Sequence, residues 1–120
     1  MKTILFAALF ASVSLATAHA QPARPPVGAE ASIPFVNHQG IRDWKPGEDD
    51  RIVYIQDAGR NWYRATLYER CLNLPFAVQV GFETKTPGQF DRFSSIVVGD
   101  QRCALSNLIA SGEPPAQKKH

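Results

Sequence analysis

Residues of the kinds that build catalytic or metal centres are scarce in this chain. His19 lies near the start of the sequence and His120 is its last residue, so His38 is the one histidine in between. The two cysteines form no C-x-x-C pair, and no serine lies in a G-x-S-x-G stretch. A nucleophilic hydrolase needs a base beside its nucleophile, and a zinc site needs several closely spaced ligands. We therefore expect no catalytic residue, no metal site and no cofactor.

A hydrophobic run long enough to cross a membrane is also missing. The apolar stretch 4–15 follows Lys2, and Ala18-His19-Ala20 presents small side chains at the positions that a signal peptidase reads. A membrane-spanning helix needs roughly 20 apolar residues, so this stretch is too short to be an anchor. The pattern predicts a signal peptide in residues 1–20, cut near Ala20. We expect an exported protein, periplasmic or extracellular, with no transmembrane segment in its mature form.

An excess of one charge is absent as well. The chain has 13 basic and 11 acidic residues, and removal of the leader takes away Lys2. Proteins that bind nucleic acids usually carry a basic stripe to meet the phosphates. The near balance of charge and the expected export both argue against nucleic acid as a partner.

The two cysteines, Cys71 and Cys103, both follow the expected cleavage site. An oxidising compartment allows them to pair. A disulfide closing a loop of this size would stabilise the fold by roughly 3–4 kcal/mol in the chain-entropy model. A small domain has a net stability of about 5–10 kcal/mol, so this bond would supply a large share of it.

Proline and glycine divide the remaining chain into three parts. Residues 21–31 contain Pro22, Pro25, Pro26 and Gly28, which predicts a flexible linker. Residues 111–120 contain Pro114-Pro115 and two lysines, which predicts a disordered tail. Residues 32–110 are left as one small β domain.

Short alternating or β-branched segments separated by turn residues predict the elements of this domain. Residues 76–82 fit either a strand or one helical turn, because so short an apolar run has no decisive period. Gly99-Asp100 suits a two-residue hairpin turn. The pattern predicts a mainly β fold, a small antiparallel barrel or rolled sheet of about five strands, possibly with one short helical turn, stapled by one disulfide. Strands are expected at 41–44, 51–56, 61–69, 90–98 and 102–105.

The first hairpin decides which residues share a face. Its link, 56–59, suits a three-residue loop in which Gly59 is left-handed. That loop places Tyr54 opposite Trp62, beside Ile52 and Arg64, on an outer face. The core face is the other one, which is almost wholly apolar: Val53, Ile55, Tyr63, Ala65 and Leu67.

The outer face is the candidate binding surface. Aromatic side chains beside a cation, here Tyr54, Trp62 and Arg64, suit a peptide, a sugar ring or another protein. Arg92 is a further candidate, because its planar guanidinium can grip a carboxylate or phosphate. The alternative is that the N-terminal segment with Ile33 and Phe35 packs over this face.

Other polar groups have structural explanations. Ser94, Ser95 and Ser106 are nucleophiles on paper, but serines on strands are usually outward polar positions. The acidic run 48–50 lacks the spacing of a calcium loop and suits a solvated turn. Asp91, next to Arg92, is expected to accept backbone hydrogen bonds in its own loop.

A set of short motifs is spread over residues 33–108. They are Ile41-Arg42-Asp43-Trp44, Tyr54-Ile55-Gln56-Asp57, Trp62-Tyr63-Arg64-Ala65-Thr66-Leu67 with Cys71, Leu74-Pro75-Phe76-Ala77, Val80-Gly81-Phe82, Phe90-Asp91-Arg92-Phe93-Ser94-Ser95-Ile96 and Arg102-Cys103. Together they resemble a family of small exported proteobacterial proteins of unknown function. The resemblance implies export and the cysteine pair, and it implies no activity, ligand or catalytic residue.

We expect a non-catalytic module that binds a protein, a peptide or a component of the cell envelope. One alternative is a small envelope hydrolase that uses His38 or Asp91. Another is an inhibitor of a periplasmic enzyme that inserts the loop 85–88 into its target.

Overall fold

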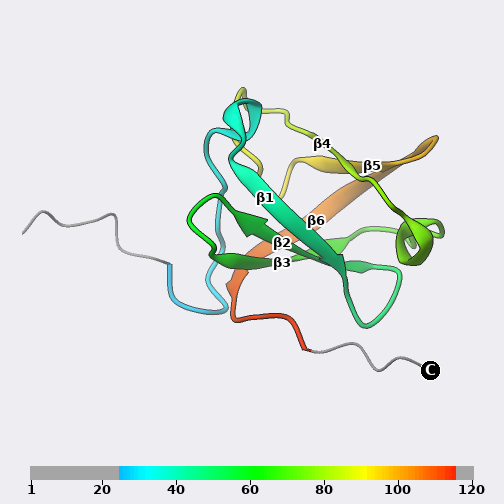
Figure 1. Cartoon of the computed structure of the whole chain (residues 1–120), viewed down its shortest axis with the longest axis horizontal. Coiled ribbons are helices and arrows are strands. Elements are labelled where there is room, and N and C mark those ends of the chain that lie inside the picture. The colour runs from blue at the N-terminus through cyan, green and yellow to red at the C-terminus, as the bar shows by residue number, and fades with distance from the viewer. Residues whose placement is uncertain (1–24, 116–120) are drawn as a thin grey trace, which may run out of the picture.

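The longest strand, β6, organises the fold. The computed structural model describes residues 25–115, so the expected signal peptide lies outside the described residues. Six strands form one antiparallel sheet in the order β1-β2-β3-β6-β5-β4 (Figure 1). In chain order they are β1 Ile41–Pro46, β2 Ile52–Asp57, β3 Trp62–Leu67, β4 Gly81–Glu83, β5 Ser95–Val98 and β6 Gln101–Ser111, with the 3-10 turns η1 Val36–His38 and η2 Leu74–Phe76.

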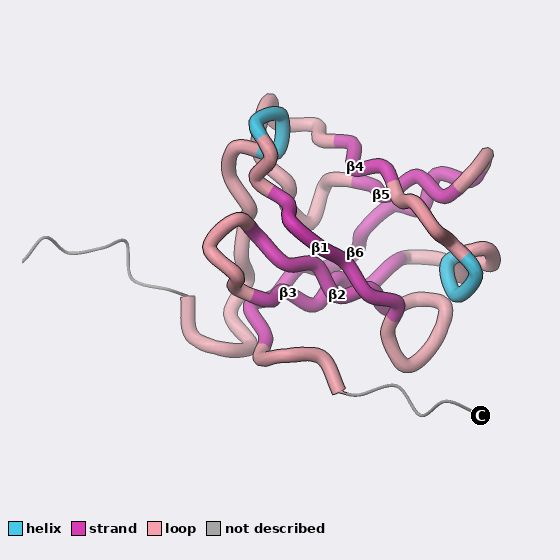
Figure 2. The backbone as a smooth tube through the Cα atoms, viewed as in Figure 1, coloured by secondary structure: helices cyan, strands magenta, loops and turns pink. Residues whose placement is uncertain are grey.

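The sheet curls into a half-barrel around its core, which confirms the predicted fold class. Figure 2 shows the strands in magenta fanning out on both sides of β6. There are six strands rather than about five, because 81–83 pairs with β5. In the part of the chain that the structure describes, no helix is long and apolar enough to span a membrane.

A bulge explains how β6 can serve both halves of the sheet. Thr66 pairs with Asn107 and Leu67 pairs with Leu105, so Ser106 is the extra residue. Inward positions shift from Cys103 and Leu105 to Leu108 and Ala110 at this point. A bulge bends and twists its strand, so β6 can pair with β5 through its first half and with β3 through its second.

The segment before η1 extends the sheet. Its backbone bonds to the edge of β6 that faces away from β3: the N–H of Gly28 donates to Ala110 and that of Ala31 to Leu108. Glu30 forms an isolated bridge with Ile109. Residues 28–31 of the expected linker are therefore bonded along β6, since β5 is too short to cover this half of that strand.

The first hairpin has the predicted faces but a different register. Tyr54 pairs with Arg64 and Gln56 pairs with Trp62, so the expected pairing of Tyr54 with Trp62 is wrong. The left-handed residue is Arg60, with φ 66°, not Gly59. The centre of the loop lies one residue later than expected, so each residue of β2 pairs with a residue of β3 two positions later than expected. An even shift keeps every side chain on its face, so the core residues of both strands are those expected.

Asp57 explains the actual loop. Its carboxylate accepts hydrogen bonds from the Asn61 N–H at 2.9 Å, the Asn61 Nδ2 at 3.0 Å and the Tyr63 hydroxyl at 2.7 Å. The N–H of Asp57 also donates to the carbonyl of Asn61. An aspartate that satisfies its own turn outweighs the preference of glycine for positive φ.

The strand expected at 90–98 is shorter in the structure. Phe90 is fully buried and pairs only with Ile33, and β5 begins at Ser95. Between them Asp91 accepts the N–H of Phe93, and Ser94 accepts the N–H of Asp91. This side-chain-capped turn replaces the first half of the expected strand.

The ambiguous segment 76–82 divides into two parts. η2, with Pro75 inside it, ends at Phe76 and supplies the expected helical turn. The chain then runs without regular structure to β4 at Gly81. Alternation of apolar residues was therefore a poor guide, because Phe76 and Val78 point into solvent.

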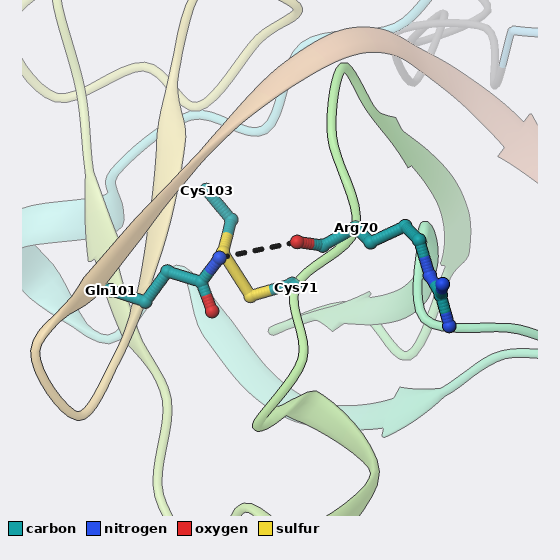
Figure 3. The surroundings of a disulfide bond; sticks show 4 residues. All are labelled: Arg70, Cys71, Gln101 and Cys103. Atoms are coloured by element: carbon teal, nitrogen blue, oxygen red, sulfur yellow. Dashed lines mark hydrogen bonds between the residues drawn. A yellow bond between two sulfur atoms is a disulfide. The ribbon is translucent and has the colours of Figure 1, made fainter.

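The disulfide between Cys71 and Cys103 is present and joins the loop between β3 and η2 to β6. Figure 3 shows it beside the Gln101 side chain, whose Nε2 donates to the carbonyl of Arg70 at 3.1 Å. Both cysteines are buried within the core. The bond fixes the start of the loop that leads to η2.

We expect the double variant Cys71→Ala/Cys103→Ala to lose roughly 3–4 kcal/mol of unfolding free energy, because the bond closes a loop with a sequence separation of 32. Urea denaturation of the wild type and the variant measures the difference. Equal midpoints and slopes would contradict this expectation.

We expect Arg60→Gly to raise the unfolding free energy by up to about 1 kcal/mol, since glycine adopts positive φ without a Cβ clash. The control is Ala58→Gly in the same loop, where φ is not positive and the change should destabilise. Thermal denaturation compares the two, and the opposite order would contradict the register.

Candidate functional site

The outer face of the sheet carries the residues that the sequence singled out. Strand pairing aligns Lys45 with Tyr54, Tyr54 with Arg64, and Arg64 with Ile109. Residues that are directly opposite in antiparallel strands project from the same face. These four side chains therefore form one row across β1, β2, β3 and β6.

The turn between β1 and β2 covers part of this face. The N–H of Gly47 donates to the carbonyl of Ile52, and a Cβ at Gly47 would collide with the Ile52 side chain. Ile52 is 8% exposed and Tyr54 only 6%. Tyr54 is therefore buried under the turn between β1 and β2.

The N-terminal segment does not cover this face as the alternative expected. Ile33 is fully buried in the core on the opposite side of the sheet, among residues such as Val53 and Ile55. Phe35 is 69% exposed. The covering element is instead the turn that contains Gly47 and Glu48.

Glu48 connects the covered part of the face to its open part. Its Oε1 accepts the Tyr54 hydroxyl at 2.6 Å, and its Oε2 lies 3.9 Å from Nη2 of Arg64. The hydrogen bond from Tyr54, helped by the backbone N–H of Glu48 and the charge of Arg64, lowers the pKa of the Glu48 carboxyl. Burial and the Glu48 carboxylate raise the pKa of Tyr54.

The open part of the face is centred on Trp62. Nζ of Lys45 lies 5.5 Å from the centre of the Trp62 ring, a cation–π contact. Arg64 is the next outward residue on β3. We call Lys45, Trp62 and Arg64 the tryptophan face.

Arg64 is poorly satisfied within this face. Its Nε is buried and donates to no partner, and its ion pair with Glu48 spans 3.9 Å. A buried donor without an acceptor costs roughly 1–3 kcal/mol. The Arg64 side chain as a whole is 38% exposed, so the other end of its guanidinium is open to an acceptor from outside.

Arg92 lies apart from the tryptophan face. Its guanidinium pairs with Glu30 at 3.1 Å and lies 4.7 Å from the centre of the Phe93 ring. Glu30 bridges Ile109, which pairs with Arg64 on β3. Two strand spacings, about 10 Å, therefore separate the backbone of Glu30 from that of Arg64. Arg92 is therefore held by Glu30 and Phe93, with β6 between Glu30 and the strand of Arg64.

The polar groups considered for catalysis take part in local structure. Asp91 and Ser94 cap their own turn, and Ser94 is 1% exposed. Ser106 donates to the carbonyl of Thr66 at the bulge. Ser95 lies on β5, and His38 is exposed in η1.

The acidic run 48–50 is also occupied by protein partners. Asp49 accepts the N–H of Arg51, and Asp50 pairs with Arg70 at 2.8 Å. Within residues 25–115, no group of three or more His, Cys, Asp or Glu side chains is arranged to hold a metal. The loop 85–88 is held at one end, where Gly88 accepts the N–H of Val36.

Lys45 and Glu48 were missed by sequence reasoning. The expected first strand stopped at Trp44, and the acidic run was interpreted only as a solvated turn. The outward position of Lys45 follows from the alternation of Trp44 and Pro46 around it, because Trp44 packs on the core. The role of Glu48 depends on how the turn folds back, which no local pattern reveals.

A family model described as Family of unknown function (DUF6491) matches residues 1–114 of the chain. No curated protein and no solved structure matches the chain. The match spans both cysteines and every residue of the tryptophan face.

We expect Tyr54→Phe to destabilise the protein at neutral pH more than at acidic pH. The lowered pKa of Glu48, below its ordinary value of 4.5, stabilises the folded state above that value, and this contribution is lost as pH falls through the folded pKa. Urea denaturation between about pH 7 and pH 3 should show the two proteins converging in acid. Tyr68→Phe, at an exposed tyrosine, is the control and should match the wild type throughout. A gap between Tyr54→Phe and the wild type that does not depend on pH would contradict the contact.

Proposed function

Because the chain belongs to this family of unknown function, which supplies no activity, we propose its role from the outer face of its sheet. We propose that it is an exported, non-catalytic binding module. Its partner is a protein, a peptide or another component of the cell envelope. The tryptophan face makes the contact.

The juxtaposition of the partly exposed Arg64 side chain with Trp62 and Lys45 is the observation that carries this proposal. Arg64 lies beside a half-buried tryptophan and a lysine, at the open side of a rigid sheet. Tryptophan and arginine dominate the binding energy of protein interfaces. A carboxylate or carbonyl oxygen of the partner would accept a hydrogen bond from the exposed end of the Arg64 guanidinium, and an apolar group would cover Trp62.

Binding is favoured over turnover because the polar side chains considered for catalysis form hydrogen bonds within the protein. Asp91, Ser94 and Ser106 are all engaged in turns or in the β6 bulge. A nucleophile must keep its oxygen available to a base and a substrate. A hydrolase that used Asp91 would therefore need its turn to open, and one that used exposed His38 would need a nucleophile other than these serines.

Export to an oxidising compartment is supported by the signal peptide predicted from residues 1–20 and by the disulfide. Disulfides persist in secreted and periplasmic proteins and are rare in the cytosol. The Cys71–Cys103 bond lies in the core, so its reduction would leave two thiols buried there.

Mass spectrometry of the protein recovered from the periplasm or medium should give an N-terminus near Gln21 and a Cys71–Cys103 peptide. Recovery of the intact leader in the cytosol would refute export.

We expect Trp62→Ala to abolish the capture of a partner while changing the melting temperature little. A truncated hot-spot residue costs about 2–4 kcal/mol of binding, whereas a half-buried side chain on an outer face contributes less to folding. The tagged protein is cross-linked in envelope extracts, and the species retained by wild type and variant are quantified by mass spectrometry.

Two variants complete the experiment. Arg64→Lys keeps the charge but loses the planar fork, so it should weaken capture by an intermediate amount. Tyr68→Ala removes an exposed aromatic beyond the end of β3 and should leave capture unchanged. If the Trp62→Ala protein unfolds, or if it retains every captured species, the tryptophan face is not the binding surface.

A further inference from the structure

The segment before η1 is held by the rest of the domain as a short strand. We call residues 28–33 the strap. Its backbone bonds to the second half of β6, where the N–H of Ala31 donates to the carbonyl of Leu108 at 2.9 Å. Further along, Ile33 and Phe90 each donate their N–H to the carbonyl of the other. In Figure 1 the strap runs from the end of β6 up to η1.

The strap also completes the core. Ile33 is fully buried and Ala31 is 8% exposed, and both belong to the main hydrophobic cluster. Loss of a buried isoleucine would leave a cavity, which is costly in a packed interior. The core therefore needs a strap, but none of these contacts requires the strap to belong to the same chain.

The connection between the strap and β1 is strained. We call residues 34–40 the hinge. Phe35 and Gln39 have φ of 61° and 62°, in the left-handed region that residues with a Cβ resist. Phe35 gains little packing in return, because it is 69% exposed. The hinge therefore stores strain while the strap is folded back onto its own chain.

The hinge is also tightly folded. The N–H of Gly40 donates to the carbonyl of Phe35 at 2.9 Å, so the two ends of the hinge lie side by side. A Cβ at Gly40 would collide with the backbone of Pro34 and Phe35. If the hinge were extended it would span roughly 25 Å. Opening would release both left-handed residues and carry the strap to a neighbouring molecule.

We propose that two copies of this chain exchange straps, so that residues 28–33 of each copy pair with β6 and Phe90 of the other. An exchanged element repeats in the dimer the contacts that it makes in the monomer. The strain released in two hinges favours the dimer and offsets part of the translational freedom that association removes. Short hinges under strain favour exchange for this reason.

Exchange would change the surroundings of Trp62. A pocket of about 150 Å³ lies beside this residue, and Pro25 and Val27, which directly precede the strap, are among the residues that line it. In the dimer these two residues would come from the second copy. Two tryptophan faces would then be held in one assembly, which favours a partner with repeated binding sites. The exchange itself does not depend on the role of the tryptophan face.

Glu30 and Ile109 allow a direct test. Hydrogen bonds flank this bridged pair on both sides, so it is the closely spaced kind of antiparallel pair, with Cα atoms about 4.5 Å apart. That distance suits a disulfide. Neither residue belongs to the core cluster, so cysteine at either position should leave the fold intact.

The experiment mixes two batches of the mature chain, one with Glu30→Cys and one with Ile109→Cys, and oxidises the mixture after equilibration. We expect a disulfide from position 30 of one chain to position 109 of the other, seen on a non-reducing gel and mapped by mass spectrometry. The control mixes Glu30→Cys with Tyr68→Cys, at an exposed tyrosine beyond β3, and should give at least about tenfold less cross-linked dimer.

Hinge variants should shift the equilibrium in opposite directions. Gly40→Ala should raise the dimer association constant by at least about tenfold, because the folded hinge has no room for a Cβ. Gln39→Gly should lower it, because glycine adopts positive φ without strain. Gly112→Ala is the control, since a Cβ there meets nothing within 4 Å. Size-exclusion chromatography with light scattering over a series of concentrations measures all three against the wild type.

The other outcomes overturn the proposal. One is a mixture that gives no cross-link between positions 30 and 109 although circular dichroism shows both chains folded. Another is a dimer that Gln39→Gly leaves unchanged, or that cross-links equally through Tyr68→Cys, because it associates through its surface alone. If Gly40→Ala unfolds, the cross-link and Gln39→Gly still decide. A monomer refutes exchange and leaves the Trp62→Ala capture experiment as it is, so the two proposals are tested apart.

Discussion

The bend of β6 at Ser106 is the constraint on which the rest of the structure depends. Without the extra residue, a strand of this length would present Leu105 and Leu108 to opposite sides of one flat sheet. With it, both halves of β6 bury apolar side chains in the same core while their partners diverge. The tryptophan face follows from the half paired with β3, and the strap bonds to the other edge of the same half.

Two exposed parts of the surface differ in the physical term that would drive association. At the tryptophan face, a partly exposed guanidinium beside an aromatic ring would gain most from a directed acceptor. Around η2, the exposed Phe76 and Val78 would gain from the removal of apolar area from water.

Sequence reasoning was most reliable where period and composition agreed. The core face of the first hairpin was correct although its loop was misplaced, because the shift of register was even. It left 76–82 open between a strand and a helical turn, and it failed at 90–94, where apolar residues alternate as in a strand. There Pro75 within η2 and the Asp91–Ser94 hydrogen bonds favour turns. Local side-chain capping competes with strand pairing, and hydrophobic pattern does not register it.

The sequence by itself determined the β class, the positions of most strands and the identity of the cysteine pair, since these follow from alternation, turn residues and the count of thiols. Tertiary structure alone decided that Tyr54 is buried under the Glu48 turn, that Arg92 lies apart from Arg64, and that residues 28–31 bond along β6. These features depend on which segments meet across the curl of the sheet. Contacts between residues that are distant in the chain arise only once the strands have paired in register. The periodicity of the sequence therefore does not reveal them.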